Sequence, residues 1–230
     1  TCALPIYEAQ QHLTAAMDAL KLHDYKTTAV TVKATPDKDG SASKKCSVCG
    51  KESTVVINKV SNIKLAKTTL TYNKKDQKPA VTVKDSAGNA LKAADYSVSY
   101  AKGSKKPGVY SIKVTLKGNY SGSKTLSYTI IPSKTTVKLS AATKSSLKAS
   151  WSKVTDITGY EVQYATANSF KGAKTVKANA KATATTLKKL TKNKKYYIRV
   201  RSYKTVKVNG KNKTIYSAWS ANKTLSTKKK

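Results

Sequence analysis

Short runs of alternating apolar and polar residues, separated by turn-forming residues, limit the fold of this chain more than any other feature. Between residues 61 and 132 they read TLTY, AVTVKD, DYSVSY, VYSIKVTL and TLSYTII. Successive side chains of a strand point to opposite faces, so each run can bury one face. Mixtures of Gly, Asn, Asp, Ser and Pro lie between the runs, as tight turns require. The pattern predicts an antiparallel β-sandwich over residues 61–132.

The same pattern continues over residues 133–227. The segments LKASWSKV, GYEVQY and LTKNKKYYIRVRSY each place apolar side chains on one face. Asn209-Gly210 stands between two strand-like runs and predicts a two-residue hairpin, because both turn positions need a positive φ. We therefore predict an all-β fold with two tandem antiparallel β-sandwiches, preceded by a short helix and a CxxC hairpin, and followed by a lysine tail at 228–230.

These segments resemble known families. Residues 133–227 resemble a fibronectin type III domain, with LKASWSKV and GYEVQY as its second and third strands. The resemblance makes Tyr196, six positions after Leu190, the tyrosine corner whose hydroxyl returns to the backbone. Residues 61–132, which close with GNYSG, resemble bacterial immunoglobulin-like repeats of large surface proteins. The implied structural residues of the fibronectin-like part are Trp151, Tyr160, Leu190 and Tyr196.

Residues 1–24 differ from the β-rich remainder. The first seven, TCALPIY, read like a translated sequencing adapter, so we interpret them as an artefact and leave Cys2 out of the argument; an ordinary loop is the alternative. Residues 8–22 repeat apolar side chains at helical spacing and predict one short helix. We interpret residues 1–24 as the remnant of a helical domain, and expect the helix to be poorly packed.

Residues 25–60 are predicted to form a hairpin module with a turn at Asp39-Gly40. The segment resembles a small module of clostridial surface proteins that opens with His-x-Tyr and ends in CxxCG. That resemblance implies a degenerate zinc knuckle with His23, Cys46 and Cys49 as ligands, because Pro36 replaces the expected further Cys. An inert or disulfide-bonded pair and a redox-active pair are the alternatives, and no other cofactor is expected.

Arginine occurs at only two positions, Arg199 and Arg201, in a chain that otherwise uses lysine. On a strand, both leave the sheet on the face opposite Ile198 and Val200. The segment YSAWS at 216–220 resembles the Trp-Ser-x-Trp-Ser motif of cytokine-receptor fibronectin domains, in which aromatic rings stack between guanidinium planes. A guanidinium stacks on an indole better than an ammonium does.

We therefore predict a surface stacking ladder in the order Tyr216, Arg199, Trp219, Arg201. Two interpretations stay open for it. The ladder is either a partner-binding surface or a rigid, solvent-exposed stack that protects a sheet edge.

The chain is strongly basic, with 45 basic residues against 11 acidic ones and a net charge of +34. From residue 133 onward there are 24 basic residues, but Asp156 and Glu161 are the only acidic ones. Such a surface attracts polyanions with an affinity that falls as salt rises, and teichoic acid and acidic glycans are the candidate partners. A specific nucleic-acid partner is not expected, since no recognition helix is present. Resistance to edge-to-edge aggregation is the alternative role.

No catalytic set is found, because neither predicted sandwich holds a His or a Cys that could pair with a Ser nucleophile. No run of apolar residues is long enough to span a membrane, and we expect any export signal or anchor outside this segment. The sequence predicts a monomeric, non-catalytic spacer or adhesion module of a secreted or cell-wall-associated bacterial protein. Accessory domains of a secreted hydrolase and a receptor-like protein binder are the alternatives.

Overall fold

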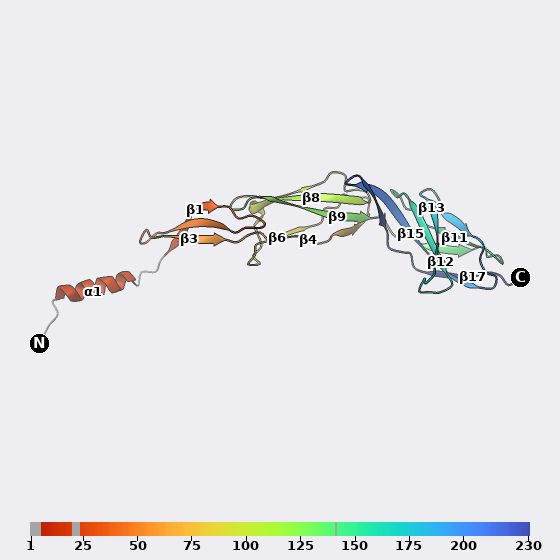
Figure 1. Ribbon diagram of the computed structural model, residues 1–230, viewed down its shortest axis with the longest axis horizontal. Coiled ribbons are helices and arrows are strands. Elements are labelled where there is room, and N and C mark those ends of the chain that lie inside the picture. The colour runs from red at the N-terminus through yellow and green to blue at the C-terminus, as the bar shows by residue number, and fades with distance from the viewer. Residues whose placement is uncertain (1–5, 20–23, 141) are drawn as a thin grey trace. The chain divides into compact units, whose positions relative to one another are not determined.

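The computed structural model describes residues 6–19, 24–140 and 142–230. Strands dominate the described chain, with one α-helix, α1 (Ile6–Ala19), and one 3-10 helix, η1 (Ala93–Asp95) (Figure 1). The predicted all-β architecture of sandwich-like sheets is confirmed. The described residues fall into two compact units. The first comprises Thr1–Lys64, Thr82–Ser97 and Val114–Lys124. The second comprises Leu65–Val81, Val98–Lys113 and Thr125–Lys230.

The described side chains of helix α1, from Glu8 to Thr14, are all exposed. Among them, the apolar side chain of Leu13 is 62% exposed. A helix of 14 residues is only marginally stable without tertiary packing. Two residues named in the sequence analysis, Cys2 and His23, lie outside the described residues.

The CxxC module is a three-stranded antiparallel sheet rather than a single hairpin, with β1 (Tyr25–Val32), β2 (Gly40–Cys46) and β3 (Glu52–Ile57). The predicted turn at Asp39-Gly40 is wrong. The connection bends earlier, where the Thr35 hydroxyl oxygen accepts the backbone N–H of Lys38 at 2.9 Å. Gly40 instead opens β2 at a close approach, because a Cβ there would lie 2.3 Å from the Val32 carbonyl oxygen.

The middle of the chain forms two sheets, β4-β6 and β5-β9-β8-β7. The five predicted runs are all strands, and β4 is an additional one that the sequence analysis missed. One pair departs from the antiparallel prediction, because β5 runs parallel to β9. The bounds are β4 (Asn62–Leu65), β5 (Thr69–Thr71), β6 (Val81–Lys84), β7 (Tyr96–Tyr100), β8 (Gly108–Leu116) and β9 (Ser123–Ile131).

The last 100 residues form a sandwich of a three-stranded and a five-stranded sheet, both within the second unit. The first sheet has the order β10-β11-β14, and the second has the order β13-β12-β15-β16, with β17 also paired to β15. Figure 1 labels β11, β12, β13, β15 and β17 of this domain. The bounds are β10 (Val137–Ser140), β11 (Leu147–Trp151), β12 (Gly159–Ala165), β13 (Lys174–Asn179), β14 (Ala184–Leu187), β15 (Lys195–Val208), β16 (Lys211–Tyr216) and β17 (Lys223–Ser226).

The core of this sandwich holds the residues that the sequence analysis marked as structural. The Trp151 ring packs against the Tyr160 ring with centroids 5.3 Å apart, and its indole N–H donates to the Ala182 carbonyl. Leu190 and Tyr196 are buried beside them. The Tyr196 hydroxyl accepts the backbone N–H of Thr191 at 2.9 Å, which is the geometry of a tyrosine corner.

The hairpin predicted at Asn209-Gly210 is confirmed. Both residues have a positive φ, 49° and 77°, and the pair Val208 and Lys211 closes the turn. This turn fixes the register of β15 against β16, which positions the site described below.

Replacing Tyr196 by Phe should lower the free energy of unfolding by about 1–2 kcal/mol, because the partly buried hydrogen bond from the backbone N–H of Thr191 loses its acceptor. Denaturant unfolding followed by tryptophan fluorescence measures this, since Trp151 and Trp219 are the only tryptophans and both lie in the last domain. The control is Tyr197→Phe, on the opposite face of the strand, with an expected change within about 0.5 kcal/mol. Equal losses in the two variants would contradict the account.

Candidate functional site

The arginine pair lies in the middle of the long strand β15. Ile198 and Val200 point inward and are fully buried, and Arg199 and Arg201 point to the opposite face. The alternation of a strand therefore divides this segment into an apolar face for the core and a guanidinium face.

The two guanidinium groups alternate with aromatic rings in one stack. The Arg201 Cζ atom lies 3.6 Å from the Tyr216 ring centroid and 4.3 Å from the Trp219 ring centroid. The Arg199 Cζ atom lies 4.5 Å from the Trp219 centroid and 3.9 Å from the Phe170 centroid. The stack thus brings together all four predicted residues and adds Phe170, from the loop between β12 and β13.

The observed order is Tyr216, Arg201, Trp219, Arg199, Phe170, so the predicted order of the two arginines is wrong. Strand β16 runs antiparallel to β15, and Tyr216 pairs with Tyr203. Each residue after Tyr216 therefore lies beside a residue of β15 with a lower number than Tyr203. Tyr216 meets Arg201 first, and Arg199 lies further along.

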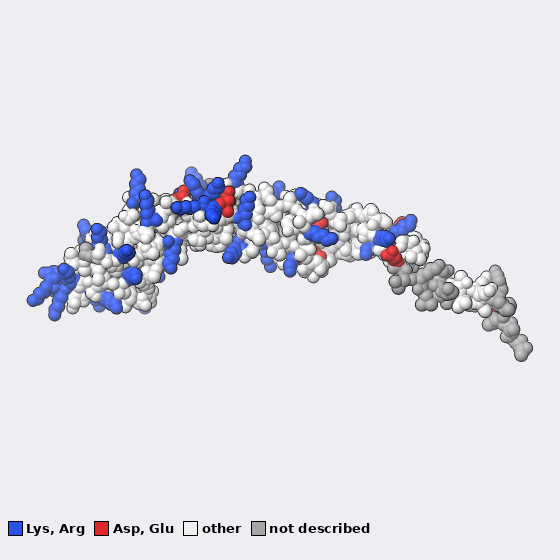
Figure 2. Space-filling model, turned by 180° about the vertical axis from the view of Figure 1, so that it is seen from behind, with Lys and Arg blue, Asp and Glu red and all other residues white. Residues whose placement is uncertain are grey.

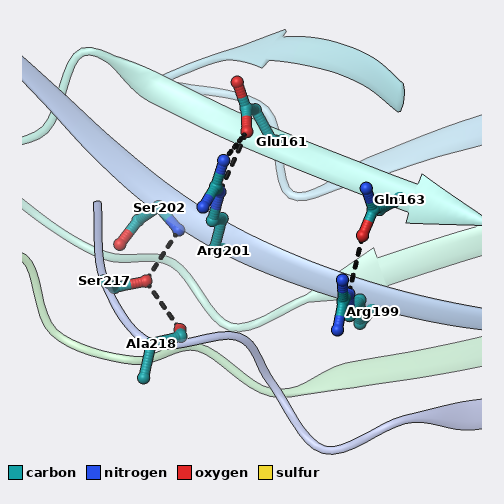
Figure 3. A network of polar contacts seen from close by, with 7 residues as sticks. All are labelled: Glu161, Gln163, Arg199, Arg201, Ser202, Ser217 and Ala218. Atoms are coloured by element: carbon teal, nitrogen blue, oxygen red, sulfur yellow. Dashed lines mark hydrogen bonds and ion pairs between the residues drawn. The ribbon is translucent and has the colours of Figure 1, made fainter. Parts of the chain in front are cut away.

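Strand β12 holds both guanidinium groups from the other side. Arg201 donates twice to one carboxylate oxygen of Glu161, from Nε at 2.9 Å and from a terminal nitrogen at 2.7 Å (Figure 3). Arg199 Nε donates to the Gln163 side-chain oxygen at 2.7 Å. The register explains these pairs, because Glu161 lies opposite Arg201 and Gln163 opposite Arg199. Charge-assisted hydrogen bonds of this kind fix the orientation of the two guanidinium groups that stack on the aromatic rings.

Two serines attach the YSAWS segment to β15. The Ser217 hydroxyl accepts the backbone N–H of Ser202 at 3.0 Å and donates to the Ala218 carbonyl (Figure 3). The Ser220 hydroxyl accepts the backbone N–H of Val200 at 2.9 Å. Both serines are buried. The two hydroxyls thus accept N–H groups of β15, and the backbone N–H groups of the same two serines donate to carbonyls of β15.

The stack is partly buried rather than solvent-exposed. The Arg201 side chain is 25% exposed, and its partner Glu161 is 9% exposed. Burial, together with the charge of Arg201, lowers the pKa of the Arg199 guanidinium from its ordinary value. Each guanidinium has rings on its faces and a side-chain acceptor at its edge. The contacts of the stack link β12, β15, the 216–220 segment and the loop residue Phe170 to one another.

The two described cysteines of the CxxC motif lie at the turn between β2 and β3. Cys46 is buried and Cys49 is exposed, and the Cys49 backbone N–H points to the Cys46 sulfur at 3.5 Å. Among the described residues no group of three or more His, Cys, Asp or Glu side chains is arranged to hold a metal ion. Zinc binding therefore stays a prediction, and it requires at least one further ligand besides the thiols of Cys46 and Cys49.

A polar cluster in the second unit surrounds the other acidic residue of the last domain. The Tyr72 hydroxyl donates to the Asp156 carboxylate, and the Lys106 ammonium lies 3.3 Å from it. The Ser133 hydroxyl donates to the Tyr72 carbonyl, while the Ser133 carbonyl accepts the Ser202 hydroxyl, both at 2.9 Å. The segment around residue 133 is thus hydrogen-bonded on both sides.

Acid should weaken this cluster. The hydrogen bond from Tyr72, and the nearby charge of Lys106, lower the pKa of Asp156. The ionised carboxylate therefore adds stability that is complete above its unfolded pKa of about 3.9 and is lost as the pH falls through the lower folded pKa. We expect Asp156→Asn to cost about 1 kcal/mol at pH 7, with the difference from the native chain shrinking as the pH falls below about 3.9.

Thermal melts of both chains from pH 7 to pH 2.5 measure this difference. Asn tolerates the positive φ of 60° at this position, so the backbone is not strained by the substitution. A difference between the two chains that is independent of pH would contradict the assignment.

Exposed lysines cover the last domain. Every lysine from residue 133 onward except Lys204 is exposed. Basic side chains are spread over the face shown in Figure 2, with few acidic ones among them. Asp156 and Glu161, the domain's two acidic residues, are bound to Lys106 and Arg201. Within residues 133–140 and 142–230, neither Asp156 nor Glu161 forms an ion pair with a lysine of the last domain. The positive charge of these lysines is therefore not neutralised by a neighbouring carboxylate.

A comparison with known protein families matches the last domain. Residues 131–218 match the family model described as fibronectin type III domain. A comparison with curated proteins found no match. None of the described helices has the length and hydrophobicity needed to cross a lipid bilayer. The match and the three-on-five sheet arrangement together identify the last domain.

Three solved structures illustrate the similarity. A two-domain fibronectin type III segment of chicken tenascin is 16% identical, with 89% of this chain and 98% of that chain covered and a TM-score of 0.41. The fn3 domain of human contactin 1 is 18% identical, with 44% and 78% covered and a TM-score of 0.35. The fn3 domain of the human collagen alpha-1(XX) chain is 23% identical, with 43% and 84% covered and a TM-score of 0.33.

Proposed function

Because residues 131–218 form a fibronectin type III domain, we propose that the chain is a non-catalytic spacer and adhesion module of a secreted or cell-surface protein, and that its last domain docks onto anionic polymers. Fibronectin type III domains typically serve as non-catalytic modules in such proteins. The resemblance of residues 61–132 to bacterial immunoglobulin-like repeats supports the same assignment, with a clostridial-type surface protein as the source. Teichoic acids of the cell wall and acidic glycans are the polymers that fit the charge.

One observation carries the docking proposal, namely that the lysines of the last domain have no acidic side chains of their own to neutralise them. Glu161 is taken by Arg201, and Asp156 by Tyr72 and Lys106. A folded surface of one sign attracts polyanions over about a Debye length, roughly 10 Å at 0.1 M salt. The exposed lysines are therefore available to an external anion.

The arginine stack has a supporting role in this proposal. Its guanidinium groups are stacked between rings and bonded to Glu161 and Gln163. Most of the surface of both groups is therefore already in contact with protein, and the Arg201 side chain is only 25% exposed. We therefore assign ligand binding to the exposed lysines and rigidity to the stack.

Co-sedimentation with Gram-positive cell walls tests the proposal. Walls with and without teichoic acid are mixed with the purified chain at low salt and at about 1 M salt, where the Debye length falls to about 3 Å. We expect binding that needs the teichoic acid and disappears at high salt. Failure to bind either wall preparation at low salt would contradict docking and leave a passive spacer.

A further inference from the structure

The outer face of the three-stranded sheet carries a regular pattern of lysines and hydroxyls. Along β10, β11 and β14, the inward side chains join the hydrophobic core, with Val137, Leu147, Ala149, Trp151 and Leu187 buried. The alternate positions form the opposite face. Together we call them the lysine–serine face, which comprises Lys138, Ser140, Lys148, Ser150 and Thr186.

Strand pairing holds the lysines of this face in fixed positions. Lys138 pairs with Ser150, Ser140 pairs with Lys148, and Lys148 pairs with Thr186 on the next strand. The two lysines are therefore diagonal neighbours, for which Cα atoms lie about 7–8 Å apart. Each lysine has a hydroxyl residue directly across from it.

The strands that form this face carry basic side chains and no acidic ones. The three strands VKLS, LKASW and ATTL contain no Asp or Glu. Within residues 133–140 and 142–230, neither Lys138 nor Lys148 forms an ion pair, and both are exposed. The acidic residue Glu161 belongs to β12 of the other sheet and is already bound to Arg201.

We propose that the lysine–serine face is the docking site for a flexible phosphodiester polymer of polyols, a deduction that rests on the proposed function. Adjacent phosphates pair with the ammonium groups of Lys138 and Lys148, which bind phosphate as point charges. Polyol hydroxyls exchange hydrogen bonds with Ser140 and Thr186. The face has no aromatic ring on which a sugar ring could stack, which favours a polyol phosphate over an acidic glycan.

The test compares two charge-matched double variants of the full chain. Lys138→Gln/Lys148→Gln removes the lysines of the face. Lys207→Gln/Lys213→Gln removes two exposed lysines from the β15–β16 hairpin of the other sheet. Calorimetric titration at about 20 mM salt uses deacylated poly(glycerol phosphate) as the probe and heparin as the glycan comparison. Circular dichroism confirms that both variants are folded.

The variant of the lysine–serine face should bind poly(glycerol phosphate) about tenfold more weakly than the native chain, and the hairpin variant less than twofold more weakly. Equal weakening by both variants would overturn the docking site but leave the diffuse lysine surface of the proposed function. A preference for heparin that only the face variant loses would overturn the assigned polymer class. Binding of neither polymer by the native chain would overturn both proposals.

Discussion

Replacing Trp219 by Ala should lower the free energy of unfolding of the last domain by about 3 kcal/mol, the largest effect expected here. The Trp219 ring lies between two guanidinium groups, at 4.3 Å from Arg201 and 4.5 Å from Arg199. Removing the ring deletes both cation–π contacts at once, and it uncovers one face of each guanidinium group. The large aromatic area that the ring buries is lost as well.

Denaturant unfolding monitored by circular dichroism measures this loss, because the variant lacks one of the two tryptophans. The matched control is Trp219→Phe, which keeps a ring between the guanidinium groups and should cost about half as much. If alanine and phenylalanine at this position were equally stable, the stack would contribute nothing to the fold.

Replacing Arg199 and Arg201 together by Lys should cost about 2–3 kcal/mol, although the net charge does not change. A lysine ammonium has no planar face to stack between Tyr216 and Trp219. It also cannot donate twice to Glu161 from one rigid group, as Arg201 does. The mostly buried Glu161 carboxylate then loses one of the two hydrogen bonds that offset the cost of burying its charge.

Chemical denaturation followed by tryptophan fluorescence measures this second effect. The control variant is Lys138→Gln/Lys148→Gln on the other sheet, with an expected change within about 0.5 kcal/mol. A double lysine variant as stable as the native chain would show that the arginines were not selected for stacking.

The order of the stack could have been derived from the sequence. Once Asn209-Gly210 is a two-residue turn, Val208 pairs with Lys211, and counting back along both strands pairs Tyr203 with Tyr216. That register brings Tyr216 to Arg201 before Arg199. The prediction went wrong because it used the residue types of the motif without applying the register of the hairpin.

Other contacts lie beyond what a sequence pattern can specify. Phe170 reaches Arg199 from a loop residue with a φ of 59°, a conformation that phenylalanine rarely adopts. The bond between Tyr72 and Asp156 joins residues 84 positions apart. Local periodicity predicts which face of a strand is buried, as at Ile198 and Val200, but it contains no information on which loops meet.

The most direct test of the central claim compares two chemical modifications of all lysines in the full chain. Reductive methylation keeps the positive charges, whereas acetylation removes them and leaves the two arginines. After circular dichroism has shown both products to be folded, their sedimentation with teichoic-acid-bearing walls at low salt is measured. The account predicts that the methylated chain binds like the native one and that the acetylated chain does not bind. Undiminished binding of the acetylated chain would contradict it, because docking would then not depend on the lysine charges.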